Sequence, residues 1–337
     1  MRDIEHARKA RFSATQDPEG PEGRTHYWQN IVLHYVEGAN LSLALRELVA
    51  HARPHAAIDL AAMHVRQNPG PWADDVRDAL LAAAQVTLDV TGYRSESYDV
   101  SELVSFLERE VEAGRIAEDD VARLELLYLP LLRHDRRPKL LHNAMGQDPS
   151  LFIEAACLAF RGEGETEREL DEQARGRALL AYELLSSWRT PPGLENGVID
   201  ASRLDTWVDE ARRRLAENNR TAIGDELIGQ MLSGSPPGTD GAWPAEPIRE
   251  VIERLKSDEL EVGLQMGRFN QRGVVSRKPL SGGDLERSIK AQYEADAAKL
   301  AARWPRTAAF LRSFATRYQR DATREDIEAE LRHDLDV

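Results

Sequence analysis

Apolar side chains recur every three or four residues along most of this 337-residue chain. Dense Leu, Ala and Val at this spacing form runs at about residues 28–37, 41–52, 54–68 and 72–91, which Gly, Asn or Pro separate. Such spacing places the apolar residues on one face of a helix. No segment alternates polar and apolar residues over the length of a strand. The sequence therefore predicts an all-α fold of short antiparallel helices, without a sheet.

Start signals refine several of these helices. Asp99, followed three residues later by Glu102, resembles a capping box before an apolar run, and Asp148-Pro149 places a cap residue before a proline at the first helical position. Ser281 with Asp284, Pro305, and Thr323 with Asp326 mark further starts. The last third is thus expected to hold helices near residues 284–302, 305–319 and 323–335.

The two halves of the chain differ in how often long irregular segments interrupt their helices. Residues 1–23 offer no apolar face and are expected to be a charged, mobile lead-in. Residues 24–162 are expected to be a helical-repeat-like domain, packed on a C-terminal helical domain over 163–337. Long irregular segments with Pro and Gly interrupt the second half, at 188–200, 233–247 and 267–284. Tryptophans border these segments, and a buried tryptophan more often pins a loop to a core than presents a binding face.

Charge and cysteine content exclude several classes of protein. The 44 Lys and Arg residues against 58 Asp and Glu residues give a net charge of −14, which argues against nucleic acid as a direct ligand. The single cysteine, Cys157, cannot form an internal disulfide, so a reducing cytoplasm is the expected location. The charged opening residues do not resemble an export signal, and no apolar stretch is long enough to span a membrane.

Standard motifs for catalysis or cofactor binding are absent from the sequence, including the phosphate-binding loop, the dinucleotide fingerprint and the serine nucleophile elbow. His51 and His55 have the spacing of two metal ligands on one helix face, but Pro54 lies between them and would break a shared helix. No metal and no cofactor are therefore assigned.

The most basic local segment contains Arg133, Arg136 and Arg137. These side chains could bind an acidic partner or a phosphate, or they could neutralise neighbouring acidic helices. The second alternative is the more common one for an exposed run of charge.

The segment from Gly263 to Asp284 combines glycines with polar and cationic side chains that precede a helix start. Its candidate partner-binding or anion-binding residues are Arg268, Asn270, Arg272, Arg277 and Lys278. Glycines, cations and free amides at a helix N-terminus are the components of an anion site. The alternative is an ordered structural loop whose arginines bond carbonyls and carboxylates, and the lack of phosphate-loop spacing favours it.

Several sequence segments form a distinctive set. They are residues 124–132 with 134–142, 185–193, 238–244, 267–273 and 304–326. Together they resemble the C-terminal helical region of large, poorly characterised bacterial multidomain proteins. The resemblance covers roughly residues 98–335. It implies a region that follows nucleotide-binding or effector domains of the kind used in signalling and phage defence, and it assigns no catalytic residue.

These observations lead to a functional expectation with one alternative. The chain is expected to be a non-enzymatic helical scaffold that binds another protein within a larger bacterial assembly, with Arg and Trp residues as candidate contacts. The alternative is an enzyme or a nucleotide-responsive or anion-responsive domain, with its site on the Gly-rich segment 267–284. The oligomeric state stays open.

Overall fold

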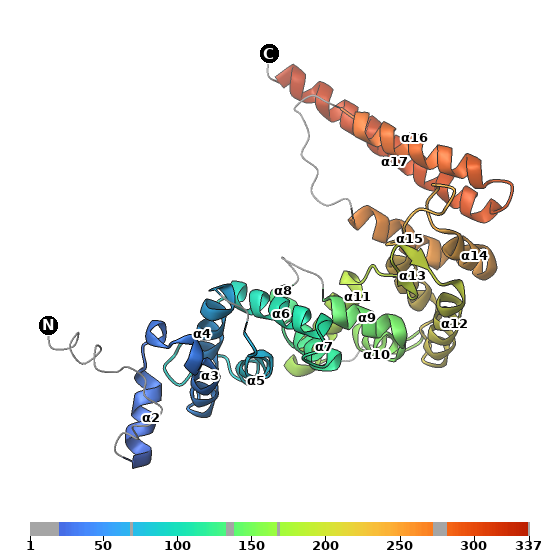
Figure 1. The fold of residues 1–337 in the computed structure, drawn as a ribbon. Coiled ribbons are helices and arrows are strands. Elements are labelled where there is room, and N and C mark those ends of the chain that lie inside the picture. Colours follow the sequence, from blue (N-terminus) through green and yellow to red (C-terminus); the bar gives the residue numbers. More distant parts are fainter. Residues whose placement is uncertain (1–19, 68–69, 133–137, 167–168, 272–281, 336–337) are drawn as a thin grey trace. The chain divides into compact units, whose positions relative to one another are not determined.

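The computed structural model describes residues 20–67, 70–132, 138–166, 169–271 and 282–335 (Figure 1). Helices make up nearly all regular structure of these residues, so the predicted all-α class is confirmed. The chain divides into two compact units, of which the first extends to Leu141 and the second begins at His142. The repeat-like packing expected of residues 24–162 and the boundary after residue 162 stay predictions.

The first unit is a run of short helices. They are α2 (Gly20–Asn30), two 3₁₀ turns (Leu33–Tyr35 and Gly38–Asn40), α3 (Leu41–Ala50), α4 (Pro54–Gln67), α5 (Ala73–Ala83), α6 (Ser97–Glu112), α7 (Glu118–Leu127) and α8 (Leu129–Leu132). Helix α4 packs against α3, α5 and α6, and it places Ile58 and Leu60 out of contact with water. The predicted helical spacing thus buries one apolar face per helix, which is what stabilises helices of this length.

Helix α5 ends at Ala83, so the predicted helix over 72–91 is too long. A residue of the segment that follows it caps α4 instead. The buried carboxylate of Asp89 accepts the backbone N–H groups of His55, at 2.9 Å, and of Ala56, at 3.0 Å. These are first-turn amides of α4 that would otherwise lack a partner, and this capping role holds Asp89 outside a helix.

Asp99 is not the cap of α6, because the helix already begins at Ser97. Its carboxylate and that of Glu102 both accept from the guanidinium of Arg66 on α4. The spacing that resembles a capping box therefore serves a contact between helices.

The second unit contains longer helices, and it also contains the only strands of the described chain. Helix α9 (Lys139–Gln147) crosses the boundary between the units, and then follow α10 (Ser150–Ala159), α11 (Glu172–Ser187), β1 (Leu194–Glu195), β2 (Val198–Ile199), α12 (Ala201–Glu217), α13 (Thr221–Leu232), α14 (Glu246–Leu255), α15 (Asp258–Asn270), α16 (Asp284–Leu300) and α17 (Pro305–Leu335). Strands β1 and β2 form a small antiparallel hairpin around Asn196 and Gly197, both with positive φ. A strand of two residues is too short for alternation to reveal.

Buried aromatic rings form part of the core of the second unit. Trp188 is fully buried, its ring centroid lies 5.4 Å from that of Trp207, and Phe152 lies 5.1 Å from Trp207. The indole N–H of Trp207 donates to the carbonyl of Met145 at 2.8 Å. Trp243 and Trp304 are buried as well. These positions agree with tryptophans that pin loops to a core.

Residues 305–335 form one continuous helix, so the expected break near residue 320 is wrong. The Thr323 hydroxyl donates to the carbonyl of Gln319 one turn earlier, a bond that an unbroken helix accommodates. Asp326 does not start a helix but accepts the backbone N–H of Gly283, at 2.8 Å, where α16 begins. The long helix thus caps its neighbour, and the two lie side by side in Figure 1.

No described helix combines the length and the apolar character that crossing a bilayer requires.

Candidate functional site

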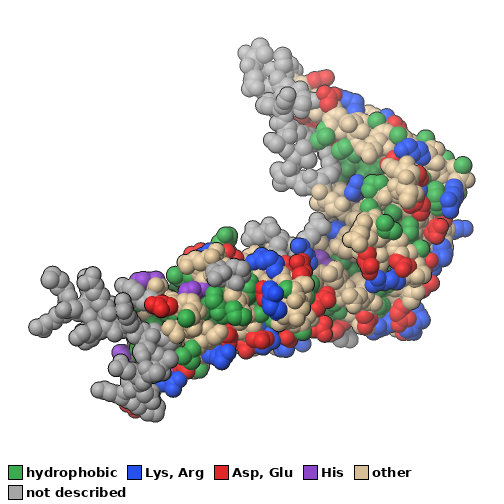
Figure 2. Space-filling model, in the orientation of Figure 1, with side chains coloured by type: hydrophobic (Ala, Val, Ile, Leu, Met, Phe, Trp, Pro, Cys, Tyr) green, Lys and Arg blue, Asp and Glu red, His purple; other side chains and the backbone are tan. Residues whose placement is uncertain are grey.

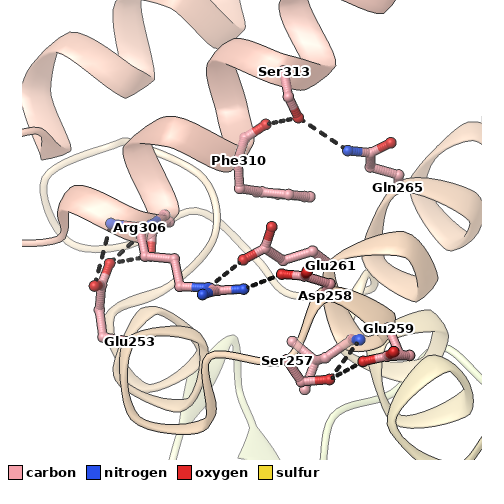
Figure 3. Close-up of polar contacts among 11 residues, drawn as sticks. Glu253, Ser257, Asp258, Glu259, Glu261, Gln265, Arg306, Phe310 and Ser313 are labelled. Atoms are coloured by element: carbon pink, nitrogen blue, oxygen red, sulfur yellow. Dashed lines mark hydrogen bonds and ion pairs between the residues drawn. The ribbon is translucent and has the colours of Figure 1, made fainter. Parts of the chain in front are cut away.

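The start of α17 is docked on α14 and α15 by a cluster of charges (Figure 3). Arg306 donates to Glu261 and to Asp258, each at 2.6 Å, and its backbone N–H donates to Glu253 at 3.2 Å. Farther along the pair, Gln265 donates to the hydroxyl of Ser313 at 3.1 Å. These bonds set α17 alongside α15 and so place their side chains on a common surface.

A buried arginine organises the segment between α13 and α14. Arg249 has no exposed surface, and its guanidinium donates to both carboxylate oxygens of Asp240, at 2.7 and 2.8 Å. It also donates to the carbonyls of Ala242 and Pro244, both at 2.6 Å, and it lies over the Trp304 ring, 4.7 Å from the centroid. Bonding to Arg249 lowers the pKa of Asp240 to about 2. The buried cation thus donates to one carboxylate and two carbonyls and lies over an aromatic ring.

This network holds Trp243 at the edge of α16. The Trp243 backbone N–H donates to the buried carboxylate of Asp296 at 3.4 Å, and its indole N–H donates to the carbonyl of Ser235 at 3.0 Å. Burial raises the pKa of Asp296. One side of the Trp243 ring is left for Arg268, whose guanidinium lies 5.0 Å from the ring centroid.

Trp243 forms one wall of a pocket of about 310 Å³ within the second unit. The loop before α14, the end of α15, and the facing sides of α16 and α17 contribute to it. The residues that line it are Trp243, Arg268, Gln271, Ile289, Gln292, Tyr293, Asp296 and Tyr318. Aromatic walls with a few convergent polar groups are typical of small-molecule sites.

Of the predicted site residues that the structure describes, Arg268 is the one that lines this pocket. Its guanidinium donates to the Tyr293 hydroxyl and to the Gln271 side-chain carbonyl, both at 3.3 Å. Asn270 is exposed at the last position of α15 and does not line the pocket. The irregular segment expected from residue 267 therefore begins later, because α15 continues through Asn270.

The other six candidate residues, Arg133, Arg136, Arg137, Arg272, Arg277 and Lys278, lie outside the described residues.

Helix α15 also carries an exposed apolar stripe. Val262, Met266 and Phe269 lie four and three residues apart, and they expose 49%, 40% and 40% of their surface. The opposite side of the helix holds the buried Leu260 and Leu264. Residues at this spacing share one helix face, so three large apolar side chains meet water together.

A row of arginines on α17 begins at the Phe269 end of this stripe. Arg317, Arg320 and Arg324 are exposed and share one face of the helix, and the Arg317 guanidinium lies 5.0 Å from the centroid of the Phe269 ring. No described carboxylate pairs with Arg317 or Arg320, while Arg324 lies 3.5 Å from Asp321. We call these six side chains, Val262, Met266, Phe269, Arg317, Arg320 and Arg324, the α15–α17 face. In the view of Figure 2, Lys and Arg side chains are interspersed with Asp and Glu over the described surface.

Sequence reasoning missed both the Arg249 network and the α15–α17 face. The spacing of Val262, Met266 and Phe269 is visible in the sequence, but spacing does not say whether a helix face is covered. The charge of Arg249 gave no hint of burial, because charged side chains are rarely fully buried.

The first unit contains a buried pair of carboxyl groups. Glu125 is fully buried and accepts the backbone N–H of Leu141, at 2.8 Å, near the start of α9. Burial, together with a hydrogen bond to the buried Glu108, raises the pKa of Glu125 well above its ordinary value. The raised pKa favours the protonated form of Glu125, and its carboxyl oxygen caps a neighbouring helix.

No group of His, Cys, Asp and Glu within the described ranges is arranged to hold a metal ion. His55 has hydrogen-bond contacts through both ring nitrogens, to Ser95 at 3.1 Å and to the carbonyl of Val86 at 3.2 Å. Cys157 is half-buried, and burial raises the pKa of its thiol, so it is not an activated nucleophile.

Comparison of the chain with models of protein families, with curated proteins and with solved structures found no match.

Proposed function

We propose that this chain is a non-enzymatic protein-interaction module whose α15–α17 face binds an acidic amphipathic helix of a partner protein. The observation that carries the proposal is the apolar stripe of Val262, Met266 and Phe269, which meets a row of exposed arginines where Arg317 lies over Phe269. A helix that docks on another helix places apolar side chains at positions i, i+3, i+4 and i+7 against such a stripe.

The arginine row favours carboxylates on the bound helix. Arg317 and Arg320 pair with no described carboxylate, so a partner with Asp or Glu beside its apolar positions would supply their counter-ions. Phe269 and Met266 would act as the anchors, because partly buried aromatic and Met side chains carry much of the energy of interfaces.

The wider setting belongs to the same proposal. The resemblance to helical regions of bacterial multidomain proteins supports a place in a larger assembly, with anti-phage defence or signalling as its setting. The single cysteine supports a cytoplasmic location.

The proposal is tested by selecting peptides from an unbiased library of helical peptides against the full chain. Enriched peptides are expected to carry apolar residues at i, i+4 and i+7, flanked by Asp or Glu. The double variant Met266→Ser/Phe269→Ser should weaken their binding at least about ten-fold, because truncated anchors typically cost more than 1 kcal/mol.

A matched control comes from α11, where Leu179 and Tyr182 expose 59% and 52% of their surface, away from the α15–α17 face. The variant Leu179→Ser/Tyr182→Ser should bind the enriched peptides as the unaltered chain does. Peptides that bind equally well to both double variants would refute the proposal, as would a library from which nothing is enriched.

A further inference from the structure

The pocket beside Trp243 contains a cation that lacks a counter-ion within the described chain. Arg268 is half-buried, and its hydrogen bonds to Tyr293 and Gln271 go to neutral acceptors at 3.3 Å. No carboxylate among the described residues forms an ion pair with it, and residues 272–281, which follow α15, contain no Asp or Glu in their sequence. Cations removed from water are usually paired with an anion.

The position of Arg268 contrasts with that of Arg249 in the same unit. Arg249 is bonded at 2.6–2.8 Å to a carboxylate and to two carbonyls, as expected for a guanidinium that only supports the fold. Arg268 is held over the Trp243 ring by a cation–π contact and by two long bonds from Nε and Nη1, so part of its planar fork remains available. Such a fork binds carboxylate or phosphate in a bidentate geometry.

Two tyrosines form a further, aromatic wall of the pocket. The rings of Tyr293 and Tyr318 are stacked, with centroids 5.8 Å apart and an interplanar angle of 18°. The Trp243 ring meets that of Tyr293 edge-on, at 73°. Flat apolar walls favour a planar ring over a flexible chain, because a ring loses little conformational freedom when it binds.

One acceptor completes the pocket. The carboxyl of Asp296 is buried and is bonded by the Trp243 backbone N–H at 3.4 Å, so it can also accept a donor of a bound molecule. Asp296 and Arg268 do not pair with each other, which leaves an anion-binding end and a donor-binding end in one space of about 310 Å³. That volume suits a single small ligand.

We infer that this pocket is a binding site for a small anion that combines a planar ring with one carboxylate or phosphate. The anionic group binds Arg268, the ring lies against Tyr293 and Tyr318, and a ring N–H can donate to Asp296. The inference does not depend on the α15–α17 face, so a peptide that binds there neither supports nor weakens it.

Calorimetric titration of the full chain tests the inference with four probes. Adenosine monophosphate and indole-3-carboxylate carry a ring together with an anionic group, whereas inorganic phosphate and indole each carry only one of the two features. At least one of the ringed anions is expected to bind at least ten-fold more tightly than phosphate or indole. Which of the two binds tells whether the natural ligand is a nucleotide or an aromatic carboxylate.

Variants assign the binding to Arg268. Arg268→Met keeps an unbranched apolar stem and removes the guanidinium charge, and it should weaken binding of the ringed anion at least ten-fold. Arg303→Met is the matched control, because Arg303 also lies over a tryptophan, 4.3 Å from the Trp304 centroid, but does not line the pocket. It should bind as the unaltered chain does.

If Arg268→Met does not fold, Arg268→Lys replaces it in the test. Lysine keeps the positive charge but lacks the planar fork, so this variant should bind the ringed anion several-fold more weakly than the unaltered chain does. The inference is overturned if neither ringed anion binds, if phosphate alone binds as tightly, or if folded Arg268 variants keep full affinity.

Discussion

At the scale of single residues, buried charged groups organise both units. Arg249 is fully buried, whereas its partner Asp240 keeps 38% of its side chain exposed. Glu125 is buried beside a second carboxyl group, Glu108. The two carboxyl groups that matter here, Asp240 and Glu125, are shifted in opposite directions, and each shift has a consequence for stability at different pH.

Asp240→Asn tests the ion pair with Arg249. The pKa of Asp240 is lowered in the folded chain from 3.8 to about 2, so the carboxylate stabilises the fold above pH 3.8, and this stability is lost as the pH falls through about 2. Solvent screens the exposed part of the carboxylate. We therefore expect the free energy of unfolding of the unaltered chain to fall by about 1 kcal/mol on acidification through this ion pair, and we expect Asp240→Asn not to show this fall. Urea unfolding followed by tryptophan fluorescence from pH 7 to pH 2 measures it.

The control for this experiment is Asp205→Asn, which removes an exposed partner of Arg254. Its acid unfolding should follow that of the unaltered chain. An Asp240→Asn curve that keeps the full acid dependence would show that Arg249 does not depend on this carboxylate.

Glu125→Gln tests the protonated carboxyl of the first unit. Its pKa is raised above 4.5 in the folded chain, so folding binds a proton, and stability falls as the pH rises above 4.5 until Glu125 ionises in the folded state. Glutamine stays neutral and can still accept the Leu141 N–H. We expect the variant to be more stable than the unaltered chain by about 1 kcal/mol at alkaline pH, with little difference near pH 4.

Hydrogen exchange of α7 amides at pH 6 and pH 9 measures this difference, with the exposed Glu118→Gln as the control. Lower protection of α7 in Glu125→Gln than in the unaltered chain at pH 9 would contradict a raised pKa of Glu125 in the folded chain.

At the scale of elements, α13 packs closely on α15 in the second unit. A side-chain carbon added at Gly263 would lie 1.9 Å from the carbonyl oxygen of Glu226, and one added at Gly229 would lie 2.1 Å from that of Leu260. The two helices therefore meet backbone to backbone, and only glycine fits at these positions. This crossing fixes the orientation of α15, and so the direction of both Arg268 and the apolar stripe.

Gly263→Ala should destabilise the second unit by about 2 kcal/mol or more, because the added methyl group meets a backbone atom that cannot move aside. Gly176→Ala, within α11, is the matched control, since nothing lies within 4 Å of the added carbon. That change should leave stability equal or raise it by about 0.5–1 kcal/mol. Thermal unfolding of both variants measures the difference. Equal melting temperatures would disprove the close crossing.

Helix positions could be predicted from spacing, because burial of one face is a local property of the sequence. Several helix caps could not be predicted from the sequence, because the capping residue lies far away in the chain. Asp89 caps α4, and Asp326 caps α16. The same reason explains the missed continuity of α17, where Asp326 resembles a local start signal but bonds a distant amide. Candidate arginines could be identified by charge. The aromatic walls that place Arg268 come from three elements distant in sequence, which spacing does not reveal.

At the scale of the whole molecule, the net charge of −14 repels other acidic chains at long range. At physiological salt this repulsion is screened beyond about 8 Å, so the local arginine row determines what the α15–α17 face attracts. A partner must therefore carry its carboxylates close to its apolar contact residues. This requirement gives specificity against apolar helices that lack acidic side chains.

The most direct test of the central claim is site-specific photo-crosslinking of the full chain in its native host. A photoreactive side chain replaces Phe269 in one variant and Tyr182, which is similarly exposed on α11, in another. We predict that position 269 crosslinks to one protein, that the crosslinked peptide lies in an amphipathic helix rich in Asp and Glu, and that position 182 does not crosslink to it. Crosslinking of the same protein from position 182 but not 269, or to a segment without acidic residues, would contradict the account.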